Sequence, residues 1–170
     1  MNELSCFNPL QLRSVRQARA RAAALVSAYY CVAPREWQRM PYEVKTLRAL
    51  DHSEVTDAAL AQTVCYNFKR AAGSLVLKEG DLYRICLQDH RILDAMGHTQ
   101  LKLGSLLTYV ITHELVHVVR FGQRLQCIDL PVELRDDEER KVEKTTRTIL
   151  AIAGDANLRH FFAGNSANPF

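Results

Sequence analysis

The stretch Ser105–Phe121, SLLTYVITHELVHVVRF, decides how the rest of the chain is interpreted. Its apolar residues cover nearly every side of a helical projection, a pattern typical of a helix buried in the core. Gly122 follows directly and predicts the end of that helix. Two histidines and one glutamate interrupt the apolar run, and a buried helix carries such side chains at a high free-energy cost unless they find partners.

The interruptions form the pattern His-Glu-x-x-His over residues 113–117. His113 and His117 are four positions apart, so an α-helix turns both imidazoles toward the same side, about one turn from each other. Zinc accepts neutral imidazole nitrogens, and this pair can hold one such ion. Glu114 lies beside the pair and can hold a water on the ion and take its proton. The competing interpretation is a pair of buried histidines that neighbouring groups satisfy by hydrogen bonds without a metal.

A third protein ligand is needed if zinc is to keep one coordination position open for water. No cysteine or histidine follows His117 at short range, and the next histidine is His160. The nearest source of a ligand is the acidic cluster at the start of the next predicted helix, Glu138, Glu139 and Glu143. Glu139 and Glu143 are four apart and share one helix face, so Glu139 can bind the ion while Glu143 accepts a hydrogen bond from a ligand histidine.

The pattern HELVH followed by Glu139-Arg-Lys-Val-Glu143 resembles the gluzincin branch of the zincin metallopeptidases over residues 82–153. The resemblance implies one zinc ion per chain, held by His113, His117 and Glu139, with Glu114 as the general base. It also implies that Glu143 supports a histidine, although Asp is the usual residue there. Glu143 as the third ligand remains the alternative, since it would match a different gluzincin-like spacing.

By this resemblance the chain is a zinc-dependent peptidase that hydrolyses peptide bonds with a water activated by Glu114. In zincins an edge strand beside the active-site helix pairs with the extended substrate, and residues 82–88 are the expected strand. His160 could move over the site and stabilise the oxyanion. Tyr109 lies one turn before His113 and could face the metal, whereas His90 and His98 are expected in loops.

Two other functions compete with the peptidase. The first is a catalytically inactive zincin-like module that binds or regulates a protein or nucleic-acid partner. Residues 1–50 favour it, because they hold eight Lys/Arg against three Asp/Glu. The second is a purely structural zinc site, which would need a fourth protein ligand.

The remaining segments predict an α+β fold with helices first, strands next and helices last. The expected helices are 9–31, 35–49, 53–61 and 105–121, followed by one from the acidic cluster 136–139 to Ala153 before Gly154. The expected strands are 63–69 and 82–88, with a third short strand at 74–78 before a turn at 79–81. We interpret residues 1–170 as one zincin-like domain: a helical segment (1–61), a metallopeptidase core (62–153) with a short antiparallel or mixed sheet, and an irregular tail (154–170).

Composition agrees with one soluble globular domain, at 170 residues with 48% hydrophobic residues, 24% charged residues and a net charge of +3. The five cysteines form no C-x-x-C pair, which favours reduced thiols and a cytoplasmic location. Residues 22–33 resemble a signal peptide after their arginines, but their helical spacing favours an amphipathic core helix. No apolar run reaches the length of a membrane span. The sequence leaves the oligomeric state open.

Overall fold

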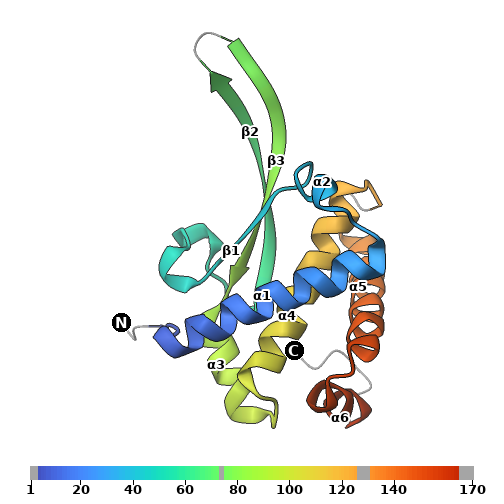
Figure 1. The fold of residues 1–170 in the computed structure, drawn as a ribbon. Helices are drawn as coiled ribbons and strands as arrows, with labels where there is room; N and C mark the ends of the chain where they lie inside the picture. Colours follow the sequence, from blue (N-terminus) through green and yellow to red (C-terminus); the bar gives the residue numbers. More distant parts are fainter. Residues whose placement is uncertain (1–3, 73–74, 126–130, 165–170) are drawn as a thin grey trace.

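A computed structural model describes residues 4–72, 75–125 and 131–164, with side chains described except at 68–80, 132 and 164. Over these ranges it is a mixed α+β fold with six helices and one three-stranded sheet, so the predicted fold class is confirmed at that level (Figure 1). The elements in chain order are α1 (Pro9–Tyr30), α2 (Pro34–Trp37), β1 (Tyr42–Lys45), β2 (Ala61–Ala72), β3 (Leu75–Leu87), α3 (Asp89–His98), α4 (Leu103–Gly122), α5 (Val132–Ala153) and α6 (Ala156–Gly164).

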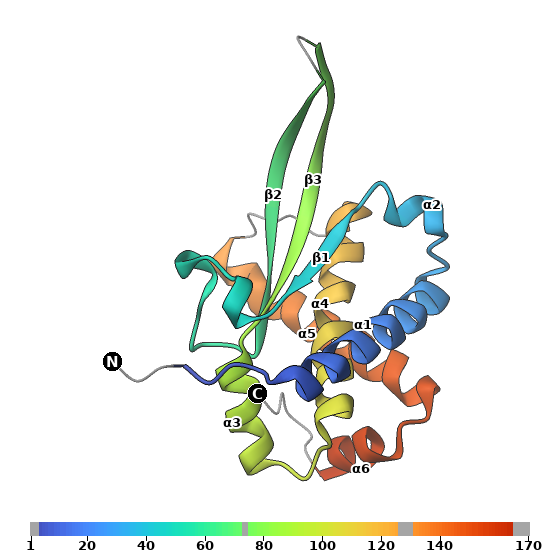
Figure 2. The same cartoon turned by 60° about the vertical axis from the view of Figure 1, so that its left-hand side comes forward.

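The sheet has the strand order β1-β3-β2, with β1 parallel and β2 antiparallel to β3. Only the base of the β2–β3 hairpin lies against the helices, and its far end projects away from them (Figures 1 and 2). Because β1 pairs with β3 from Tyr83 to Cys86, β3 is central there. The prediction of an edge strand at residues 82–88 is therefore wrong, and β2 forms the edge beside α4.

Helix α4 is the centre of the core, and α1 packs along it. The buried side chains of α1 recur every three or four residues, and two of the four are alanines that allow close approach: Val15, Ala18, Ala22 and Val26. Asn8 caps this helix by accepting hydrogen bonds from the Leu10 and Gln11 backbone N–H groups. The predicted helices 9–31 and 105–121 are thus confirmed to within a residue or two at each end.

Residues 34–60 differ most from the prediction, because they hold no long helix. Instead of helices at 35–49 and 53–61, the chain forms the short α2, strand β1 and two single 3-10 turns, Leu47–Ala49 and His52–Glu54. Pairing with β3 overrides helical periodicity here, and the Tyr83 N–H donates to the Pro41 carbonyl at 2.9 Å. Residues 75–78 lie in a strand as expected, with residue 74 outside the described residues. The turn expected at 79–81 is wrong, because β3 continues through it to Leu87.

Three helices begin or extend where the sequence analysis expected none. Helix α3 carries His90 and His98, which were predicted in loops. Helix α5 starts at Val132, ahead of the acidic cluster, and α6 replaces most of the irregular tail. The signal for α6 is Asp155, whose carboxylate accepts from the Asn157 and Leu158 N–H groups in the manner of an N-cap.

Two glycines end helices for different reasons. Gly154 has φ +71° and ends α5 in the left-handed conformation, as predicted. Gly122 instead allows close approach, because a Cβ there would lie 2.7 Å from the Met40 Sδ. In the described part of the chain, no helix combines the length and the apolar character that a membrane span requires.

Candidate metal centre

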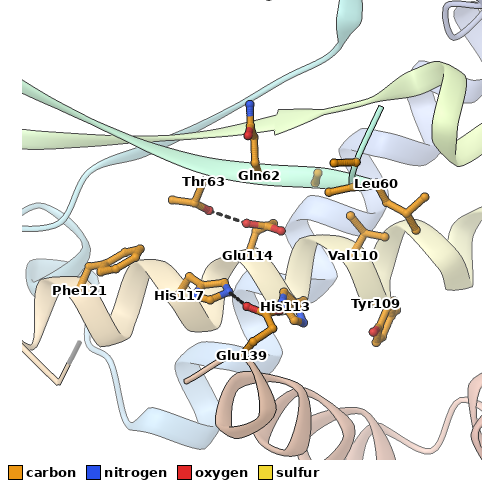
Figure 3. Close-up of a pocket in the computed structure, with 13 residues that line it drawn as sticks. Leu60, Gln62, Thr63, Tyr109, Val110, His113, Glu114, His117, Phe121 and Glu139 are labelled. Atoms are coloured by element: carbon orange, nitrogen blue, oxygen red, sulfur yellow. Dashed lines mark hydrogen bonds and ion pairs between the residues drawn. The ribbon is translucent and has the colours of Figure 1, made fainter. Parts of the chain in front are cut away.

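The histidines of α4 face a carboxylate from α5. The His113 Nε2 lies 2.7 Å from one oxygen of Glu139, and the His117 Nε2 lies 3.2 Å from the other. One ligand atom from each of the three residues falls within 4.8 Å of the others. Figure 3 shows Glu139 reaching the pair from α5, while Glu114 points from α4 toward β2. The structure therefore brings together the three residues expected as metal ligands.

A buried ion pair joins α4 to α5 next to these ligands. Arg120, one turn beyond His117, donates from its Nε to the Glu138 Oε1 at 2.6 Å, and its Nη2 contacts the same carboxylate. Glu138 is 5% exposed and immediately precedes Glu139. Because an arginine pairs with a carboxylate in a defined geometry, this contact sets where Glu139 meets the histidines. Sequence reasoning named Glu138 only as a possible ligand, and the structure instead pairs it with Arg120.

Glu143 contacts the other nitrogen of His113. Its Oε2 lies 3.4 Å from the His113 Nδ1 and accepts from the Tyr109 hydroxyl at 2.8 Å, while its Oε1 accepts from the Arg147 Nε at 2.6 Å. The His113 Nδ1 is buried and has no well-aligned hydrogen bond among the described residues. The two acids thus differ in their histidine contacts: Glu139 contacts both histidines, whereas Glu143 contacts only His113 of the pair.

The two carboxylates favour a positive charge between them. Burial by itself lowers the pKa of His113, but hydrogen bonds with Glu139 and Glu143 outweigh it and raise this pKa to about 10. Burial would raise the pKa of Glu139 and of Glu143. At Glu139 the hydrogen bonds with His113 and His117 outweigh burial, and at Glu143 those with His113, Arg147 and Tyr109 do. Both pKa values therefore lie below their usual range.

Glu114 is held on the opposite side of the centre, at 7% exposure. Its Oε2 accepts a hydrogen bond from the Thr63 hydroxyl of β2 at 2.7 Å (Figure 3). The Thr63 hydroxyl donates only to this oxygen, and the Glu114 Oε1 receives no hydrogen bond from it. Sequence reasoning missed Thr63, because nothing in the local pattern shows which strand residue faces α4.

The centre opens into a cavity of about 400 Å³ between α4 and the edge of β2. Leu60 and Val110 lie at one end of this cavity, and Phe121 lies at the other (Figure 3). The Gln88 N–H donates to the Leu60 carbonyl at 2.9 Å, so in this antiparallel pair Leu60 turns its backbone toward β3. Alternation then directs the backbone groups of Ala61 and Thr63 to the open side of β2.

The other candidate residues fall outside the cluster or acquire a different role. His160 is exposed on α6 and lines a separate cavity rather than the one at Glu139, so the structure does not bring it to the centre. Tyr109 lines the metal cavity but donates its hydroxyl to Glu143. Arg147 was also missed, although its position four residues after Glu143 on one helix predicts their ion pair.

A scan against protein-family models gave no match, and searches of curated proteins and of solved structures gave no significant match.

Proposed function

We propose that this protein is a zinc-dependent peptidase. One observation carries the proposal: two imidazoles and one carboxylate converge to within 4.8 Å on the wall of a cavity that also contains Glu114. Membership of the zincin superfamily belongs to the same proposal and is supported by the spacing of these residues along α4 and α5.

The donor set suits zinc. Zinc takes imidazole nitrogens at about 2.0–2.1 Å and carboxylate oxygens at similar distances, usually with four ligands in all. His113, His117 and Glu139 would hold it, and three protein ligands leave one position for water. The buried His113 Nδ1 beside Glu143 is consistent with a ligand histidine oriented from behind. When bound, zinc supplies Lewis acidity that makes water a better nucleophile and polarises a carbonyl.

Glu114 is the proposed general base and acid. Thr63 engages one of its oxygens, so the other is left to take a proton from water and return it to the leaving amine nitrogen. The outward backbone of Ala61 and Thr63 would pair with an extended peptide beside Glu114, which supports peptides as the substrate class. This role falls to β2 and not to the strand named from the sequence.

The test compares Glu114→Gln with a control, Glu133→Gln, which removes an exposed acid from the first turn of α5. Zinc-loaded proteins are assayed on a mixed fluorogenic peptide library, and bound zinc is counted by metal analysis. We expect Glu114→Gln to bind about one zinc per chain and to lose roughly a hundredfold or more in rate, as general-base removal does. The control should match the parent. Equal activity in Glu114→Gln would overturn the mechanism.

A second function has one observation in its favour, a surface of exposed arginines on α1 and α2. They are Arg13, Arg16, Arg19, Arg21 and Arg35. Two acids of the same segment have partners of their own, since Glu36 accepts from the Ala33 N–H and Glu43 pairs with Arg84. This basic surface supports an inactive module that binds an acidic protein or nucleic acid. Salt-sensitive binding to nucleic acid, with no cleavage of the peptide library, would favour that function.

A further inference from the structure

A second, larger cavity lies next to the metal cavity. It has a volume of about 720 Å³, and Ala58, Ala59 and Leu60 line both cavities. Its other walls come from the end of α3, the segment 99–101 and the start of α6. An extended chain covers about 13 Å from Thr63 to Ala59. A peptide lying along β2 therefore reaches the second cavity within a few residues of Glu114.

The polar wall of this cavity holds several groups that can donate hydrogen bonds and only one acid among the described residues. The polar residues other than Asp94 are Arg91, His98, Thr99, Gln100, Asn157 and His160. Asp94 is the one acid that lines it among the described residues, and its carboxylate is already engaged. The Arg91 Nη1 lies 3.3 Å from the Asp94 Oδ2, and the His98 Nε2 lies 3.7 Å from the Oδ1.

Two buried polar atoms of the wall residues have no hydrogen-bond partner in the described part of the chain. They are the Arg91 Nε and the Thr99 Oγ1. A buried donor without an acceptor costs free energy, and the cost is larger on a charged group. A guanidinium has five N–H donors in a planar fork that matches a carboxylate. Because the Nε is buried, a ligand in the cavity would meet the two Nη groups, of which Nη1 also contacts Asp94.

We propose that the second cavity binds a carboxylate of the peptide substrate, with Arg91 as its main partner. That the ligand is a peptide rests on the proposed peptidase function. That it carries a carboxylate rests on the cavity alone. The carboxylate belongs either to an Asp or Glu side chain or to the C-terminus of the peptide. The first makes the cavity a specificity pocket for acidic residues, and the second restricts cleavage to positions near a C-terminus.

Binding of small probes tests the cavity without requiring catalysis. Zinc-loaded Glu114→Gln protein is titrated with N-acetyl-glutamate α-amide, N-acetyl-alanine and N-acetyl-glutamine α-amide. These carry a side-chain carboxylate, a terminal carboxylate and no carboxylate, respectively. The backbone amide resonances of Thr99 and Gln100, which line the cavity, are followed by NMR. We expect saturable shifts with one of the two carboxylates and at least about tenfold weaker binding of the neutral probe. The carboxylate that binds identifies the source.

Two variants make the test decisive. Arg91→Met should abolish the preference for the carboxylate, and Arg91 is exposed enough for this change to leave the fold intact. Asp94→Asn removes the competing negative charge and should tighten binding several-fold. An exposed arginine of α5, changed in Arg140→Met, is the control and should bind like the parent. Equal binding of all three probes, no saturable binding, or unchanged binding in Arg91→Met would overturn the proposal. An active peptidase that fails this test would lose only the carboxylate pocket.

Discussion

Two acidic clusters in this molecule differ in the cationic groups that face their carboxylates. Glu54, 2% exposed, accepts from the Tyr66 hydroxyl at 2.5 Å, the Arg84 Nη1 at 2.9 Å and the Asp51 N–H at 2.8 Å. Both of its oxygens have donors, and the guanidinium offsets its charge. Although burial by itself raises the pKa of Glu54, these three donors lower it to about 2.

The cluster at Glu139 is built differently. Arg147 pairs with Glu143, but Glu139 contacts two imidazoles, which carry a positive charge only when protonated. A metal ion bound there would take the place of the imidazole proton that the two carboxylates favour. A buried acid with its own arginine stabilises a fold, whereas acids that face imidazoles, whose protons a metal ion can replace, provide a site for an ion.

The largest effect on stability is expected at the Glu54 cluster. Glu54→Gln leaves Arg84 with only part of its buried partners and should lower the free energy of unfolding by about 3 kcal/mol, in the range for broken buried ion pairs. Urea denaturation measures this loss, and zinc affinity should remain that of the parent. A loss below about 1 kcal/mol, or a parallel loss of zinc binding, would contradict the separation of the two clusters.

The same cluster predicts a pH dependence. The pKa of Glu54 is about 2 in the folded protein against an ordinary value of 4.5, so its contribution to stability is fully present above pH 4.5. The contribution is lost as the pH falls from 4.5 toward 2. In urea denaturation, the difference between the parent and Glu54→Gln should therefore shrink across that range. A difference that stays constant would show that the charge of Glu54 is not what stabilises the fold.

Substitution of a metal ligand should have the opposite effect, changing zinc affinity while leaving the free energy of unfolding nearly unchanged. His117→Ala removes one of three protein ligands and should weaken zinc binding about a hundredfold, because apparent zinc free energies of roughly 10–16 kcal/mol are shared among the ligands. Competition with a chromophoric chelator measures the affinity, and urea denaturation of the metal-free protein should show little change. His98→Ala on α3 is the control, since this exposed histidine lies outside the cluster. Equal zinc affinity in His117→Ala would remove the proposed centre.

The smallest effects come from matched tyrosine variants. Tyr66→Phe takes a donor from Glu54 and should lower the unfolding free energy by about 1.5 kcal/mol with no change in zinc affinity. Tyr109→Phe takes a donor from Glu143 and should weaken zinc binding about tenfold, as loss of an outer hydrogen bond to a ligand histidine does. If both variants affected only stability, the two clusters would be alike.

The features predictable from the sequence are those that depend on helical spacing. Four-residue intervals fix which side chains share a face, so His113 and His117, or Glu139 and Glu143, are paired on their helices before any fold is known. That α5 lies against the histidine face of α4 is a tertiary fact, and the sequence indicates it only through the need for a third ligand and the family resemblance.

The features that could not be predicted depend on partners distant in sequence. Strand β1 exists because its backbone pairs with β3, and the position of β3 between two strands follows from the same pairing. The single turn at His52–Glu54 ends in a glutamate whose donors come partly from Tyr66 and Arg84. The prediction that His160 lies over the metal centre was wrong for a related reason. Helix α6 begins at Ala156 and places His160 at the second cavity.

The division of the ligands between two helices has a mechanical consequence. An ion held by His113, His117 and Glu139 would cross-link the C-terminal half of α4 to the N-terminal half of α5, beside the ion pair of Arg120 and Glu138. Without the ion, that junction depends on side-chain contacts alone: the salt bridge of Arg120 with Glu138 and the contacts of Glu139 and Glu143 with α4. Amide hydrogens in the first turns of α5 should then exchange with solvent faster than those of α4, which the core encloses on nearly all sides.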